Sequence, residues 1–119
     1  MGKIPPHSLE SEQSILGAMI IDKEAINTAI ENIKAEDFYK EANKEIFETI
    51  IELYNRNEPV DLITLSEELK RRNTLENVGG LTYLSNLSNG ISTTANTKYY
   101  CKIVEEKSVL RLLIKSCDE

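Results

Sequence analysis

The feature that most constrains this chain of 119 residues is a helix predicted near its C-terminal end. At about 100° per residue, eight mostly apolar residues between Thr97 and Cys117 fall within roughly half of the helix circumference. These are Tyr99, Tyr100, Ile103, Val104, Leu110, Leu113, Ile114 and Cys117. Val109 and Leu112 lie outside that arc, so residues 109–114 are apolar almost all round. Half of a helix can pack on one core, but the remainder needs another cover. The sequence therefore predicts an assembly module whose terminal helix contacts a second copy, another segment of its own protein or a partner.

Length and composition indicate one globular domain with an extension. The hydrophobic fraction of 40% and the charged fraction of 29% are ordinary for a globular protein. No run approaches the roughly 18 apolar residues that a membrane span needs, and the first residues lack a secretory signal. We therefore expect a cytoplasmic protein without membrane partners. Cys101 and Cys117 would lie about 24 Å apart on one helix, too far for an intrachain disulfide, so reduced thiols are expected.

Charge is distributed unevenly along the chain, whose net charge is −6. Residues 1–97 carry nine bases and sixteen acids, whereas residues 98–115 carry five bases and two acids. The overall acidity argues against broad binding to phosphate backbones, so little direct nucleic-acid binding is expected. The basic terminal helix could contact an acidic partner surface, including that of another copy, or could simply be solvated; the sequence leaves both open.

Helical periodicity and capping residues recur along the chain, and no segment shows sustained alternation, so an all-α fold is predicted. Ser8 and Asp22 are positioned to cap the first two helices. The third helix, near residues 41–56, has the strongest apolar stripe and should be central. A capping box of Thr64 and Glu67 is expected to start a fourth helix that ends near residue 73. A short helix should follow residues 79–80, and residues 92–94 should cap the terminal helix.

Two side chains stand out within this pattern. Glu12 interrupts the apolar stripe of the first helix, and a buried carboxylate needs hydrogen-bond donors. We expect it to accept bonds from backbone N–H groups at the start of a neighbouring helix. Phe38, in the short segment between the second and third helices, should insert into the core.

Catalytic and cofactor motifs are not found in the sequence. His7 is the single histidine, and a packing or surface contact explains it better than a metal site or a catalytic triad. The glycine pair at residues 79–80 lacks the lysine and hydroxyl of a phosphate-binding loop. No enzyme activity, metal or cofactor is therefore expected of this segment.

A helix-turn-helix DNA-binding domain is the main alternative. The third helix, the turn at residues 57–61 and the fourth helix could form the motif, with Lys70, Arg71 and Arg72 near phosphates. These basic residues, however, lie at the C-terminal end of the fourth helix. A recognition helix reads DNA base pairs mainly with its N-terminal residues, which here include the acidic Glu67 and Glu68. Carboxylates at these positions would repel phosphate. A free-standing helical adaptor is the third hypothesis.

Five segments in order resemble the N-terminal domain of bacterial replicative DNA helicases of the hexameric DnaB type. They are IPPHSLESEQSILG (4–17), EDFY (36–39), EPVDLITL (58–65), GGLTYL (79–84) and TANTKYYCKIVEEKSVLR (94–111). Each segment is weak alone, but their order is specific, and the resemblance extends from residue 4 to about residue 115. Ser11 and Cys101 stand where a small residue such as alanine is expected.

The resemblance implies a compact orthogonal bundle of five to six helices, residues 1–92, followed by the first helix of a dimerisation hairpin, residues 93–119. It implies subunit pairing to a homodimer, a hexameric collar of three dimers, and docking of the C-terminal domain of primase, with a helicase loader as a further partner. The linker and the ATPase motor, which would bind ATP and Mg²⁺, are expected outside these residues.

The resemblance also suggests which residues make these contacts. The predicted subunit interface comprises Tyr100, Ile103, Val104, Lys107, Val109, Leu110, Leu112, Leu113 and Ile114. The predicted primase contacts are Glu10, Tyr83 and Ile114, because Tyr83 and Ile114 are apolar groups near the surface and Glu10 could meet a basic rim. Burial in the core is the alternative for Tyr83.

Overall fold

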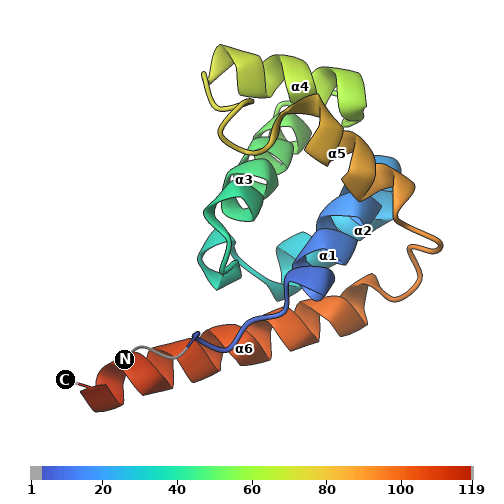
Figure 1. The fold of residues 1–119 in the computed structure, drawn as a ribbon. Helices are drawn as coiled ribbons and strands as arrows, with labels where there is room; N and C mark the ends of the chain where they lie inside the picture. The colour runs from blue at the N-terminus through green and yellow to red at the C-terminus, as the bar shows by residue number, and fades with distance from the viewer. Residues whose placement is uncertain (1–3, 119) are drawn as a thin grey trace.

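A computed structural model describes residues 4–118 of the chain. Within this range the chain forms six α-helices and one 3₁₀ turn, and no strand. The elements are α1 (Leu9–Ile21), α2 (Lys23–Asn32), the turn η1 (Ala35–Asp37), α3 (Glu41–Asn55), α4 (Leu62–Arg71), α5 (Gly80–Asn89) and α6 (Thr97–Asp118). The first five helices form a bundle, which we call the head, and α6 runs beneath it (Figure 1). The all-α prediction is confirmed.

Helix α1 is the centre of the head, because α2, α3, α5 and α6 all pack against it. Its residues from Ile15 to Ile20 are buried on every side. The expectation that the third helix is central was therefore wrong. Helix α3 has the predicted one-sided stripe, which includes Ile46, Phe47, Ile50 and Leu53, and this helix packs against α1 and α4. A one-sided stripe indicates a helix at the edge of a core, whereas an apolar surface all round indicates a helix inside it.

Gly17 allows α1 and α5 to approach closely. A Cβ atom at this position would lie 2.3 Å from the Leu87 carbonyl oxygen and 2.5 Å from Cγ1 of Ile91. Because the first of these atoms belongs to the backbone, a side chain at position 17 would force the two helices apart. Gly17 thereby fixes the position of α5 relative to the centre of the head.

Local capping matches the sequence at two helices and differs at two others. Ser8 Oγ accepts a hydrogen bond from the Ser11 N–H, and Asp22 Oδ1 accepts one from the Glu24 N–H, as predicted. Helix α4 instead begins one turn earlier than predicted, with Asp61 as its N-cap in a reciprocal box with Thr64. Thr64 therefore occupies the third helical position of this box and does not cap the helix.

The start of α6 also differs from the prediction. The helix begins at Thr97, whose hydroxyl donates to the Thr94 carbonyl at 2.9 Å. The Thr94 hydroxyl donates to Asp22 Oδ2 at 2.7 Å and so ties the loop to the start of α2. The predicted capping of the terminal helix by residues 92–94 was therefore wrong, because the loop packs on the head before the helix starts. Within residues 4–118, no helix has the length and hydropathy required to traverse a lipid bilayer.

Candidate interaction surfaces

The face of α6 that contacts the head is made mainly of small side chains. Residues Thr97, Cys101, Val104 and Ser108 are buried, at spacings of four, three and four, and the half-buried Arg111 continues this stripe three residues later. Small residues let α6 approach α1 and α2 closely. The predicted docking arc was therefore wrong in its direction, because Tyr99 and Leu113 are exposed while Thr97 and Ser108 are buried. Val104, predicted at the subunit interface, is only 2% exposed and packs in the core.

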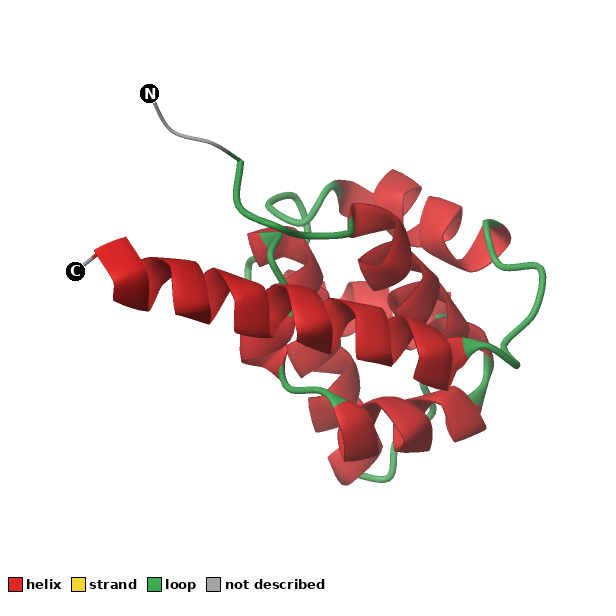
Figure 2. Cartoon of the chain, turned by 90° about the horizontal axis from the view of Figure 1, so that it is seen from below, coloured by secondary structure: helices red, strands yellow, loops and turns green. Residues whose placement is uncertain are grey.

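The large apolar residues at the C-terminal end of α6 remain exposed. Leu112 and Leu113 are 63% and 58% exposed, and Val109, Leu110 and Ile114 are each more than two fifths exposed. We call these five residues the arm surface. This part of α6 extends beyond the head (Figure 2), and even Leu112, which lies closest in direction to the buried stripe, is exposed. A contiguous group of large exposed apolar side chains is typical of an interaction site.

The remaining predicted interface residues lie between these two surfaces. Ile103 and Lys107 are half-buried, and Tyr100 packs partly against the core. On a helical projection Ile103, Leu110 and Ile114 lie on one shared face, about 100–140° from the buried stripe. A partner that covers the arm surface could therefore also contact Ile103 without displacing the head.

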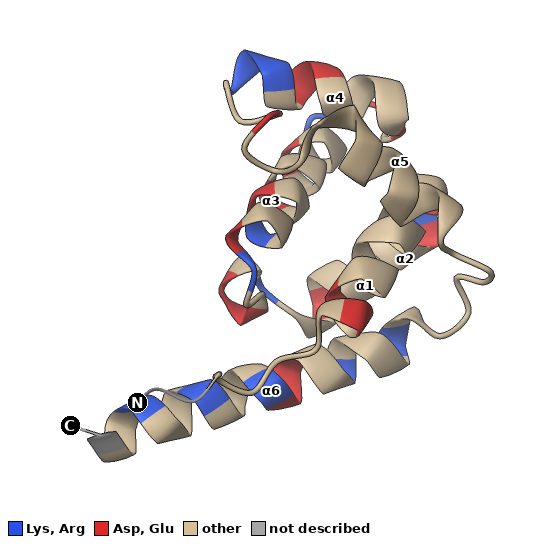
Figure 3. Cartoon of the chain, viewed as in Figure 1, with Lys and Arg blue, Asp and Glu red and all other residues tan. Residues whose placement is uncertain are grey.

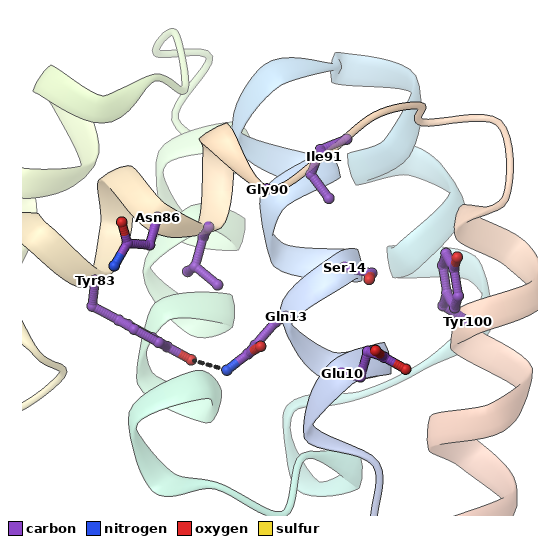
Figure 4. Close-up of a pocket in the computed structure, with 9 residues that line it drawn as sticks. Glu10, Gln13, Ser14, Tyr83, Asn86, Gly90, Ile91 and Tyr100 are labelled. Atoms are coloured by element: carbon purple, nitrogen blue, oxygen red, sulfur yellow. Dashed lines mark hydrogen bonds between the residues drawn. The ribbon is translucent and has the colours of Figure 1, made fainter.

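A groove of about 610 Å³ lies between α1, α5 and the start of α6. Its lining residues are Glu10, Gln13, Ser14, Tyr83, Asn86, Leu87, Gly90, Ile91 and Tyr100. Figure 4 shows Glu10 and Ser14 of α1 between Tyr83 and Asn86 of α5 on one side and Tyr100 of α6 on the other. Two of the three residues predicted to contact primase, Glu10 and Tyr83, thus share one concave surface.

Tyr83 is held in place by polar contacts on its buried side. Its hydroxyl donates to Asn43 Oδ1 at 2.6 Å and accepts from Gln13 Nε2 at 3.5 Å. The ammonium nitrogen of Lys40 lies 4.6 Å from the centre of the phenol ring, a cation–π contact. Tyr83 is therefore half-buried, with a fixed hydroxyl and a ring that forms part of the groove wall.

Ile114 does not belong to this groove. It follows Tyr100 by fourteen residues, which corresponds to about 21 Å along a helix. The structure therefore places the three residues predicted to contact primase on two separate surfaces, the groove and the arm surface.

The buried carboxylate of Glu12 has the partners that the sequence predicts. Its Oε2 accepts from the Tyr39 N–H at 2.7 Å, and its Oε1 accepts from the Lys40 N–H at 3.4 Å and from Asn43 Nδ2 at 2.9 Å. Lys40 is the N-cap residue of α3, so the donors lie at a helix start as expected. Phe38, beside them, is buried against Phe47, as predicted.

The basic residues at the end of α4 form ion pairs with acids of the same chain. Lys70 pairs with Glu67 at 3.4 Å, Arg71 with Glu68 at 2.8 Å, and Arg72 with Glu45 at 3.0 Å and with Glu52. Figure 3 shows these cations close to acidic residues of α3 and α4. The hydrogen bond from Arg56 is the main cause of a lowered pKa for Glu68. Because these cations are already paired, the charge placement disfavours the helix-turn-helix alternative.

The role of Arg111 was not predicted from the sequence, in which it was only one of five basic residues of the terminal helix. Its guanidinium donates to the carbonyl oxygens of Pro6 and Asp37, which are far from it in sequence. The spacing of Arg111 from Ser108 and Val104, on one face of the helix, is the signal that could have revealed this contact. His7 stacks on Tyr39, which confirms the expected packing role.

Taken together, these elements form an all-α domain with a helical head, a groove and an exposed apolar arm. The chain belongs to the family of DnaB-like helicase N-terminal domains, whose family model matches residues 4–106. It is 47% identical over 114 residues to the replicative DNA helicase DnaB of Geobacillus stearothermophilus, and 43% identical over 114 residues to the replicative DNA helicase DnaC of Bacillus subtilis. Each match covers 96% of this chain and 25% of the relative.

A solved structure shows the same fold. The crystal structure of the N-terminal domain of DnaB helicase from Mycobacterium tuberculosis matches with a TM-score of 0.94 and 41% identity. The match covers 97% of this chain and 83% of that one. The fold and the family assigned by resemblance are thereby confirmed.

Proposed function

We propose that this chain acts as the N-terminal domain of a replicative DNA helicase, where it pairs subunits through the arm surface and docks primase. The whole protein would couple ATP hydrolysis, with Mg²⁺, to DNA unwinding in a motor domain. Support comes from the family, from relatives named as replicative DNA helicases, and from the exposed arm.

The observation that carries subunit pairing is the exposure of five adjacent large apolar side chains on a helix whose other face is already packed. A second copy would present the same surface, and a two-fold axis would let the two arms bury each other's leucines. Flanking bases on α6, including Lys107 and Lys115, would remain at the rim of this contact, where charges stay hydrated (Figure 3).

Sedimentation equilibrium tests the pairing. The double variant Leu110→Asp/Leu113→Asp should be monomeric at concentrations where the wild type self-associates, because it places carboxylates in the apolar contact. Ile63→Asp is the matched control, since Ile63 is 74% exposed but lies on α4, away from the arm. A wild type that stays monomeric throughout, or an arm variant that associates as well as the wild type, would contradict pairing through this surface.

Primase docking is the second part of the proposal. The groove carries one carboxylate, Glu10, beside the fixed ring of Tyr83, and the arm surface contributes Ile114. Tyr100, which lines the groove, and Ile114 lie about 21 Å apart along α6, so a partner that spans this distance with a basic residue and an apolar residue could contact both.

Titration with the C-terminal domain of the matching primase tests this part. Glu10→Lys and Ile114→Ala should each weaken binding without loss of helicity, because both side chains are on the surface. Glu31→Lys, a charge reversal at an exposed position of α2, is the control. Unaltered affinity in both test variants would remove this site from consideration.

A further inference from the structure

Arg111 is the last half-buried residue of α6 before the exposed residues 112–117, and the buried stripe ends with it. Its guanidinium spans two segments that are remote in sequence, since Nη1 donates to the Pro6 carbonyl at 3.0 Å and Nη2 donates to the Asp37 carbonyl at 2.7 Å. One side chain thus joins α6 to the extended N-terminal segment and to the end of η1.

Tyr39 connects the same three parts of the chain. The Arg111 Cζ atom lies 5.5 Å from the centre of its ring, within cation–π range. The ring of His7, in the N-terminal segment, stacks on Tyr39 with centroids 4.2 Å apart and planes at 12°. The Tyr39 N–H donates to the buried carboxylate of Glu12. The cluster is therefore anchored to α1, the centre of the head.

We propose that His7, Tyr39 and Arg111 form a clasp that fixes the angle at which the C-terminal part of α6 leaves the head. The clasp sets the direction in which the arm surface faces, and so prepares that surface for a second copy. Its role in assembly rests on the proposed pairing function. Its effect on the angle of α6 does not depend on that function.

The clasp is suited to this role by its position and its chemistry. Residues 112–117 extend about 9 Å beyond Arg111, so a change in angle at Arg111 displaces Leu112, Leu113 and Ile114 of the arm surface relative to the head. Arginine presents several N–H groups in a planar fork, which lets one side chain hold two carbonyls, whereas a lysine ammonium is a single point charge. Lysine at position 111 would donate all its hydrogen bonds from one nitrogen and lack the planar fork, so it would leave the arm less well aligned.

Spin-label distance measurements test the angle directly. Cys117 is exposed, whereas burial raises the pKa of the Cys101 thiol to about 12, so Cys117 reacts selectively. A second label at Thr82→Cys on α5 completes the pair, since Thr82 is exposed. The Leu110→Asp/Leu113→Asp background keeps the protein monomeric, so that only intramolecular distances contribute. The distance distribution should broaden in Arg111→Ala and Tyr39→Leu, broaden less in Arg111→Lys, and stay unchanged in Lys102→Ala, which removes an exposed base of α6.

Self-association in the native background gives the second readout. Arg111→Ala should weaken dimerisation by about tenfold, because an arm that is not held in place must be ordered when the two copies meet, while circular dichroism remains that of a folded helical protein. A wild type that does not associate would contradict the proposed pairing, yet broadened distances would still support the clasp. The clasp proposal would be overturned if the distance distributions of Arg111→Ala and Tyr39→Leu were as narrow as that of the labelled protein in which both residues are intact.

Discussion

Helix α1 and the arm surface of α6 have the same sequence signature and opposite environments. Residues 15–21 of α1 and residues 109–114 of α6 are each apolar almost all round the helix. In α1, Ile15 and Leu16 are fully buried by four other helices of the chain, whereas on the arm Leu112 and Leu113 are more than half exposed. A helix that is apolar on all sides is therefore predicted to pack against other protein segments. The pattern does not show whether those segments belong to the same chain or to another molecule.

The two halves of α6 show what decides between these environments. Between residues 97 and 108, α6 contacts the head through small residues such as Cys101 and Ser108, which permit a close approach. Its large residues are left on other faces or beyond the end of the head. Size and position along the helix, more than hydrophobicity, determine which residues of α6 pack against its own chain.

The largest expected effect is a difference between matched leucine truncations in the two regions. Leu16→Ala should lower the free energy of unfolding by about 4 kcal/mol, because it leaves a cavity in the centre of the head. Leu113→Ala should change it by less than about 0.5 kcal/mol in the monomer, since its side chain is already exposed. Urea unfolding at low protein concentration measures both. Similar losses in the two variants would show that the arm packs on its own chain and would break the comparison.

A smaller effect is expected when Glu12, the buried carboxylate of α1, is altered. Glu12→Ala should lower the free energy of unfolding by about 3 kcal/mol, since it leaves two backbone N–H groups and the Asn43 amide without their acceptor. Glu12→Gln keeps an acceptor oxygen and should cost less. Glu10→Ala, two residues earlier on the exposed side of α1, is the control. If Glu12→Ala were as stable as this control, the carboxylate would not contribute to the packing of α1.

The close contact of α1 with α5 should produce the next effect. Gly17→Ala should lower the free energy of unfolding by about 2 kcal/mol, because the strain from overpacking exceeds the gain in helix propensity. Gly90→Ala is a suitable comparison, since a Cβ there would come no nearer than 3.1 Å to the Asn86 carbonyl oxygen. Thermal unfolding followed by circular dichroism distinguishes the two. A stabilised Gly17→Ala would mean that α5 can move away from α1 at little cost.

Local features of the fold could largely be predicted from the sequence. The caps at Ser8 and Asp22 and the partners of Glu12 depend on residue types that few other arrangements satisfy. The start of α4 was misplaced because Asp61 and Thr64 are both good capping residues, and only the backbone shows which of them lies outside the helix.

Long-range features were harder to predict. The direction of the docking face of α6 could not be read from hydrophobicity, because the buried residues Thr97 and Ser108 are polar and the exposed Leu113 is apolar. The groove joins Glu10 with Tyr83, which are remote in sequence, and the contacts of Arg111 are with backbone carbonyls, which every residue possesses. For Arg111 the sequence carries only its spacing from Ser108 and Val104, which places it on the buried face of α6 but does not identify the carbonyls it contacts.

The smallest expected effect concerns charge, and it extends the comparison from apolar groups to ions. The cations of α4 pair within the chain, just as the apolar residues of α1 pack within it. The hydrogen bond from Arg56 lowers the pKa of Glu68 below its ordinary value of 4.5. Ionised Glu68 therefore stabilises the folded state above pH 4.5, and this contribution is lost as the pH falls through the lowered pKa. Glu68→Gln should therefore be slightly less stable than the wild type near neutral pH, and the difference should shrink in acid. Glu67→Gln, whose exposed ion pair with Lys70 is hydrated, should show no such convergence. Urea unfolding at about pH 7 and about pH 3 measures the differences, and a constant gap for Glu68→Gln would show that its stabilising contribution is not ionic.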